Sequence, residues 1–241
     1  MSALPTAARS GREPIGGAAA GSIRHPLVRA LLVLTFSTGL VDAVSFLGLG
    51  RVFTANMTGN IVLLGFGITG SGGLPVIAPL VSLGAFLAGS AVGGRLAATT
   101  GDRHARHVAR ALEIEIGLIL AAAIIAAATD VRPSTVAGHA VIVLLALAMG
   151  VRNATVRRLG VPDLTTTVLT MTLTGLAADS RPAGGSGQGT LRRASAVLAM
   201  LCGAAAGALL LKISLVPPLL AAATLALLVA LAYRPASPRQ T

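Results

Sequence analysis

Long apolar runs alternate along the chain with segments that carry about two thirds of the charged residues. A helix needs roughly 20 apolar residues to cross about 30 Å of hydrocarbon. Six runs reach that length: 27–49, 74–96, 108–129, 135–156, 191–211 and 215–233. Two further segments, 52–68 and 161–178, are shorter or more polar. The pattern predicts an all-α polytopic membrane protein with about six transmembrane helices and two polar re-entrant or broken-helix segments.

The two ends of the chain differ from this apolar pattern. Residues 1–26 are rich in Ala, Gly, Ser and Arg and lack the apolar stretch of a signal peptide, so we interpret them as a disordered basic tail. We expect a single transmembrane domain over 27–233, followed by a short tail at 234–241. Within this domain we expect two repeats, 27–130 and 134–233.

The positions of the basic residues indicate the topology. Suppose that both polar segments enter and leave the membrane on one side and that the amino terminus is cytoplasmic. The outside then keeps only Arg51, Arg132 and Lys212, in line with the positive-inside rule. If 52–68 crossed the membrane, the arginine-rich loop at 94–110 would lie outside, against the positive-inside rule. Versions with seven or eight spans, in which one or both polar segments cross, remain open. We therefore expect a multi-pass protein of the bacterial inner membrane with both termini in the cytoplasm.

Composition narrows the range of partners. The chain is 54% hydrophobic and 11% charged, which is typical of membrane proteins. Its net charge of +11 would favour nucleic-acid binding in a soluble protein, but aromatic residues make up only 2% and the arginines flank apolar runs. We therefore expect anionic lipid headgroups, and no nucleic acid, as partners. Cys202, the single cysteine, lies in an apolar run, and we interpret it as a small buried packing residue.

The two halves of the chain share a weak internal repeat. Gly39-x-x-Asp42-Ala43 matches Gly150-x-x-Asn153-Ala154, and Thr58-Gly59-Asn60 matches Thr170-Met171-Thr172 with a small gap. Each half next carries a small-xxx-small pair, which by default packs helices closely. These pairs are Gly89 with Gly93, and Gly203 with Gly207. With three spans in each half, the second copy would be inverted relative to the first, as in several transporter folds.

The polar segments hold many short side chains that can bond to a broken helical backbone. Backbone groups freed within a membrane are tolerated only where protein or cavity water satisfies them. The first segment offers Thr54, Asn56, Thr58 and Asn60. The second opens with Pro162 and Asp163, followed by six threonines, Thr165, Thr166, Thr167, Thr170, Thr172 and Thr174. These side chains either line a site for a solute or ion, or only join helices by hydrogen bonds.

Two long motif blocks resemble a known family. They are V-D-A-V-S-F-L-G-L-G-R-V-F-T-A-N-M-T-G-N and M-G-V-R-N-A-T-V-R-R-L-G-V-P-D-L-T-T-T-V-L-T-M-T-L-T-G-L-A-A-D. Together they closely resemble the bacterial YoaK family of uncharacterised integral membrane proteins, and the likeness covers nearly all of 27–233. The resemblance implies a multi-span inner-membrane protein with no established activity. A glutamine and a glycine are frequent in the second block of that family, where this chain has Arg152 and Met171.

Asp42 is the first candidate for a functional side chain. A charged residue inside a bilayer is costly, so it usually faces a bundle interior or a wet cavity. Helical spacing places Thr38, Asp42 and Ser45 on roughly one stripe of the first span. Arg152 is next to Asn153, the repeat partner of Asp42, so we expect an ion pair between Asp42 and Arg152. Two roles for Asp42 are then open. It either forms a structural ion pair or helix cap, or it couples transport to a proton or cation.

Other ionisable residues are weaker candidates. We expect Glu113 to pair with Arg110 at the interface, and Glu115 to lie slightly deeper. His104 and His107 fall in a charged segment that we interpret as a solvated loop rather than a metal site. His139 is isolated in an apolar run. No catalytic motif and no cofactor or metal motif is present, so we expect no enzyme activity.

The favoured interpretation is a transporter-like protein that moves a small solute through a central polar site between the two repeats. The candidate substrate- or ion-binding residues are Asp42, Asn56, Thr58, Asn60, Arg152, Asn153, Thr167, Thr170 and Thr172. The many threonines and few charges weakly favour a small neutral or weakly polar solute. The alternative is a structural or partner-binding membrane protein that does not transport. The sequence leaves the substrate, any coupling ion and the oligomeric state open.

Overall fold

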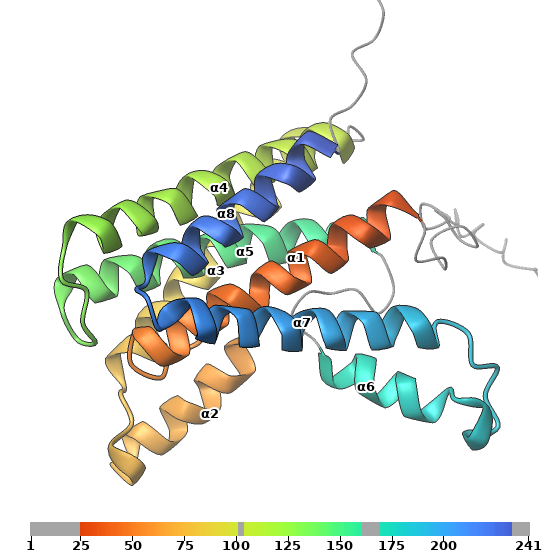
Figure 1. Cartoon of the computed structure of the whole chain (residues 1–241), viewed down its shortest axis with the longest axis horizontal. Helices are drawn as coiled ribbons and strands as arrows, with labels where there is room; N and C mark the ends of the chain where they lie inside the picture. The colour runs from red at the N-terminus through yellow and green to blue at the C-terminus, as the bar shows by residue number, and fades with distance from the viewer. Residues whose placement is uncertain (1–24, 101–103, 161–168, 233–241) are drawn as a thin grey trace, which may run out of the picture.

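A computed structural model describes residues 25–100, 104–160 and 169–232 of the chain (Figure 1). The tails, Thr167 and the start of the second polar segment lie outside the described residues. The described residues form helices and turns, without strands. The main helices are α1 (Pro26–Ala43), α2 (Met57–Ile68), α3 (Ile77–Thr100), α4 (His104–Ala128), α5 (Val136–Leu159), α6 (Leu169–Ala178), α7 (Thr190–Leu211) and α8 (Val216–Ala232). The protein is thus an all-α membrane protein, as its sequence predicts.

The lengths of the helices separate membrane spans from shorter elements. In the described residues, five helices are long and apolar enough to cross a bilayer, namely α3, α4, α5, α7 and α1 with its π-helical extension Val44–Gly48. Helix α8 has 17 residues and runs beside α4 (Figure 1). Helices α2 and α6 have 12 and 10 residues, or about 18 and 15 Å at 1.5 Å per residue, which is too short to cross.

Helix directions place the two short helices at opposite ends of the bundle. Figure 1 shows α1 running from right to left and α5 from left to right. Helices α2 and α6 both begin near the middle of the bundle, and they lead away from it toward the left and the right, respectively. Helix α2 therefore returns to the end at which α1 finished, which is the course expected of a re-entrant hairpin.

Each half packs its first helix against the other half. Helix α1 contacts α7 and α8, whereas α5 contacts α3 and α4. The short helices instead stay within their own half, since α2 packs on α3 and α6 packs on α7. Helices α4 and α8 then meet each other. The two halves are interlocked, so neither encloses a core of its own.

Glycines permit both of these crossings. A Cβ on Gly203 would collide with the carbonyl oxygen of Phe36 in α1, and a Cβ on Gly89 would collide with that of Leu147 in α5. The next glycines repeat the pattern. A Cβ on Gly207 would lie 2.8 Å from Cβ of Ala43, and one on Gly93 would lie 2.8 Å from Cβ of Ala154. Only glycine allows the backbones to approach this closely.

The described basic residues gather at one end of the bundle. This basic end is where α1, α4 and α7 begin and where α5 finishes (Figure 1). It carries Arg29, Arg95, Arg106, Arg110, Arg157, Arg158, Arg192 and Arg193. The opposite end carries Arg51, Arg132 and Lys212, and Arg132 is paired with Asp130 at 2.6 Å. This asymmetry is the one that the positive-inside rule describes.

Two sequence-based interpretations were wrong. His104 and His107 do not lie in a loop, because α4 begins at His104, and His107 is buried. The helix extends four residues beyond the apolar run, since Arg106 and Arg110 can face outward while His107 faces inward. Cys202 is exposed on α7 rather than buried, because the inward side of α7 is occupied by its glycines.

Candidate functional site

A cavity of about 570 Å³ lies where α1, α2, α6 and α7 meet. Its polar lining includes Asp42, Asn56, Thr58 and Thr170, which come from both halves of the chain. Its apolar lining consists of Phe46, Phe53, Val62, Leu63, Leu169 and Met200, and Gly59 completes the wall. We call this space the central cavity. Four of the residues that the sequence singled out therefore line one space.

Asp42 is the charged side chain of the central cavity. It lies in the second half of α1, and only 5% of its surface is exposed. The backbone amide of Ala55 donates to its Oδ1 at 3.0 Å. The backbone amide of Thr54 also interacts with the carboxylate. Within the described residues, the buried Oδ2 has no hydrogen-bond partner. A buried carboxylate oxygen without a partner is costly, so it indicates either a ligand position or a proton position.

The turn between α1 and α2 brings its backbone amides to Asp42. Helix α1 ends in a π-helical turn, Val44–Gly48, a form that is frequent at functional sites. Gly50 and Arg51 then take positive φ values of 93° and 59°, which reverse the chain. The reversal brings Ala55 back beside Asp42, thirteen residues earlier in the chain.

Asn60 fixes this turn and does not line the cavity. It is fully buried, and its Oδ1 accepts the backbone N–H of Phe53 at 2.8 Å. Its amide nitrogen donates to the carbonyl oxygen of Phe53 at 2.6 Å and to Oγ of Ser82 at 3.2 Å. Ser82 donates in turn to the same carbonyl at 2.7 Å. These contacts join the turn to α2 and α3, so the side chain of Asn60 acts on the cavity through Phe53.

The start of α2 shapes one wall of the cavity. Asn56 caps the helix, because its side chain accepts the backbone N–H of Gly59 at 3.2 Å. A Cβ on Gly59 would lie 2.8 Å from the ring of Phe53, so glycine lets that ring pack closely against the helix. The ring of Phe53 stacks on that of Phe46, with centroids 4.8 Å apart. The stacked pair forms an aromatic surface close to Asp42.

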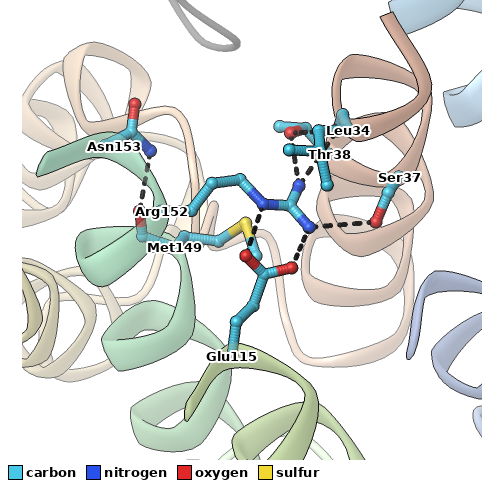
Figure 2. Close-up of polar contacts among 7 residues, drawn as sticks. All are labelled: Leu34, Ser37, Thr38, Glu115, Met149, Arg152 and Asn153. Atoms are coloured by element: carbon cyan, nitrogen blue, oxygen red, sulfur yellow. Dashed lines mark hydrogen bonds and ion pairs between the residues drawn. The ribbon is translucent and has the colours of Figure 1, made fainter. Parts of the chain in front are cut away.

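Arg152 lies in a second buried site and is not paired with Asp42. Figure 2 shows its guanidinium between Glu115 of α4 and the α1 residues Leu34, Ser37 and Thr38. Nε donates to Glu115 Oε2 at 2.9 Å, and one terminal nitrogen donates to Oε1. The other terminal nitrogen donates to Leu34 O and Thr38 Oγ1, both at 2.9 Å. We call these residues the arginine cluster.

The ion pair expected between Asp42 and Arg152 was therefore wrong. Position 152 follows Val151, which faces Gly93 on α3, and this register turns Arg152 toward α4 and α1. Glu115 was the missing partner. A buried arginine needs a carboxylate, and Glu115 is buried in the span next to α5. That need is the signal by which the sequence could have identified the pair.

The remaining candidate residues are placed only in part. Asn153 points away from the arginine cluster, and its amide nitrogen donates to the carbonyl oxygen of Met149 at 2.8 Å (Figure 2). Thr172 is buried on α6, as its repeat partner Asn60 is on α2. Neither Asn153 nor Thr172 lines the central cavity. Sequence reasoning did not anticipate Phe46, Phe53, Met200 or Ser82, whose roles depend on how the turn folds back.

The central cavity offers groups that can bind a ligand. An aspartate, two threonines and an asparagine line a space whose other walls are apolar. In the described part of the chain, no three His, Cys, Asp or Glu side chains are grouped to hold a metal ion. The cavity thus offers an anionic hydrogen-bond acceptor beside aromatic and aliphatic surface.

Comparison with known proteins agrees with this architecture. Residues 30–232 match the family described as "Protein of unknown function (DUF1275)". The chain is 33% identical over 150 residues to UPF0700 transmembrane protein YoaK of Bacillus subtilis (strain 168). That match covers 62% of this chain and 65% of the relative, just under two thirds of its length. No solved structure matches the chain. With its helices and its two motif blocks matched over 30–232, this multi-pass membrane protein belongs to the YoaK family, DUF1275.

Proposed function

We propose that the protein is a transporter that moves a small solute through the central cavity, without enzymatic activity. The observation that carries the proposal is Asp42, a buried carboxylate within a membrane span that lines a cavity and whose Oδ2 has no partner in the described residues. A residue that served assembly alone would be satisfied by its neighbours, as Asn60 is.

We further propose that the two halves are inverted repeats that rock against each other around the cavity. Three observations support this. Helices α1 and α5 run in opposite directions (Figure 1). Thr58 and Thr170, which match in the repeat, line the same cavity. Gly203 meets α1 as Gly89 meets α5. Inverted repeats of this kind allow the cavity to open to either side in turn.

The orientation belongs to the same proposal. In this view the basic end faces the cytoplasm of a bacterium, in contact with anionic lipid headgroups. Both termini are then cytoplasmic, because α1 begins and α8 ends at the basic end. Single cysteines at Gly72 and Gly185, in a Cys202→Ala background, test it with a membrane-impermeant maleimide on intact cells. We expect labelling at Gly72 alone. Labelling at Gly185 alone would reverse the orientation.

Alternating access is tested with cysteines in the cavity. Thr58→Cys and Thr170→Cys, again without Cys202, are labelled from each side of sealed membrane vesicles with the same reagent. We expect both positions to react from both sides, because the cavity opens to each side in turn. A cysteine at Ala148, which is fully buried in α5, is the unreactive control.

The alternative of a structural or partner-binding protein predicts a different result. In that case water does not enter the bundle, and neither cavity cysteine reacts from either side. Reaction from one side only would also contradict transport, since the cavity would then be a fixed pocket. Neither outcome depends on knowing the solute.

A further inference from the structure

We propose that the central cavity binds a small organic cation, namely a protonated amine with a compact apolar body. This inference rests on the proposed function and names the class of its substrate. It starts from the charge of the cavity. Asp42 is the charged residue of its described lining, and none of the described lining residues is basic. A ligand with a positive charge would therefore compensate the buried carboxylate.

The hydrogen bonding of Asp42 favours a ligand that carries N–H groups. Oδ1 is occupied by the amide of Ala55, whereas Oδ2 has no donor in the described residues. A protonated amine can donate to Oδ2, and a second N–H can donate to a hydroxyl oxygen of Thr58 or Thr170. A quaternary ammonium group has no N–H and would leave Oδ2 without a hydrogen bond.

The rest of the cavity wall favours an organic ligand over a metal ion. Six of the lining residues are Phe, Val, Leu or Met. A bare monovalent or divalent cation needs several oxygen ligands around a small space. The cavity instead has a volume of about 570 Å³, and its described polar side chains are those of Asp42, Asn56, Thr58 and Thr170. Apolar walls of this kind bury a carbon skeleton.

The aromatic pair adds a second element of recognition. Phe46 follows Asp42 by four residues and stacks on Phe53, and both rings line the cavity. Ammonium groups are attracted to aromatic faces within about 6 Å of the ring centroid. An amine bound to Oδ2 of Asp42 would thus have its charge near a carboxylate and its body against the rings.

The test uses the purified full-length protein in detergent with ¹⁴C-benzylamine, which is protonated at pH 7. Equilibrium dialysis measures saturable binding. We expect Asp42→Asn to weaken binding about tenfold or more, because hydrogen bonds to charged groups are the strong ones. Glu113→Gln removes an exposed carboxylate on α4 and serves as the control that keeps binding unchanged. Thr58→Val keeps the charge and is expected to weaken binding by about threefold.

Competitors decide the ligand class. Unlabelled benzylamine should displace the probe, whereas benzyl alcohol, which has the same ring without the charge, should not. Displacement by benzyl alcohol at equal concentration would overturn the requirement for a cation. Displacement by Na⁺, but not by K⁺ or choline at equal ionic strength, would assign the carboxylate to a metal ion and overturn the proposal.

The failure of this inference is distinguishable from failure of transport. If Thr58→Cys and Thr170→Cys react from both sides but benzylamine does not bind, the cavity transports another class of solute and the amine proposal falls. If the cysteines do not react, transport itself falls. Circular dichroism melting of Asp42→Asn checks that the variant is folded, and Thr58→Val provides the second test if it is not.

Discussion

Two buried charged sites lie about one turn apart on α1, and they are built in opposite ways. In the arginine cluster, all five N–H groups of Arg152 have acceptors, and both oxygens of Glu115 are used. At Asp42, one oxygen is bonded and the other has no donor in the described residues. The satisfied site joins α1, α4 and α5 and leaves no bonding capacity for a ligand. The unsatisfied site borders a cavity, where a ligand can complete it.

The strongest way to break this comparison is to remove one partner of the satisfied site. Arg152→Met leaves Glu115 buried without its countercharge, and breaking a buried pair costs about 3 to 5 kcal/mol. We expect a loss of this size in the free energy of unfolding, measured by denaturant titration in mixed micelles.

The matched control is the double variant with Glu115→Leu and Arg152→Met. It removes both charges, so we expect it to regain most of the lost stability. A single variant that costs less than about 1 kcal/mol, the level of an exposed pair, would show that the pair is not buried in solution.

Asn60 extends the comparison to a satisfied polar residue beside the cavity. Asn60→Ala leaves the backbone N–H of Phe53 without an acceptor, and each orphaned buried group costs about 1 to 3 kcal/mol. We expect a loss of about 2 kcal/mol or more in the free energy of unfolding. Thr58→Ala, two residues earlier on the exposed side of α2, should change it by less than about 0.5 kcal/mol. Equal effects would contradict a role of Asn60 in fixing the turn.

Two glycines of α3 allow a comparison between a close backbone contact and an open position. Gly89→Ala places a Cβ against Leu147 and should destabilise the protein by about 1 to 3 kcal/mol. Gly84→Ala, five residues earlier on α3, has open space around it and should stabilise the helix by up to about 1 kcal/mol. Melting temperatures of the two variants should therefore shift in opposite directions. A shift of the same sign in both would argue against the close crossing of α3 and α5.

Among the buried polar residues, the smallest expected change in stability belongs to Asp42. Asp42→Asn keeps a carbonyl oxygen that can accept from Ala55, and it removes the charge that has no compensation. We expect the free energy of unfolding to change by less than about 1 kcal/mol, while benzylamine binding weakens about tenfold or more. A large loss of stability would place Asp42 with the arginine cluster as a structural residue.

Much of the fold follows from the sequence, because the bilayer imposes a simple rule on length and polarity. The expected spans correspond to α1, α3, α4, α5, α7 and α8, and the segment 52–68 contains α2. The ends of helices were less accurate. Helix α4 begins at His104 rather than at 108, since arginines on its exposed side do not break a helix that buries His107.

The candidate site was predictable in composition but not in pairing. Asp42, Asn56, Thr58 and Thr170 lie on one cavity, and the matching of the halves had related Thr58 to Thr170. Arg152 and Asn60 point elsewhere. A helical pattern gives the spacing of residues along one element, but it does not say which neighbour each side faces. That information comes from the crossings of α1 with α7 and of α5 with α3, which are contacts far apart in the chain.

The burial of α1 between α7 and α8 has a consequence for how the protein is made. Of the 18-residue apolar window of α1, 67% is buried, against 17% for that of α7, although α1 is synthesised before α7. When α1 enters the membrane, the helices that will cover Asp42 do not yet exist. The polar side of α1 must therefore stay exposed to lipid, to water or to an insertion factor until α7 and α8 have been inserted. Membrane insertion should accordingly be most sensitive to loss of membrane chaperones at the stage when the ribosome-bound chain ends before α7.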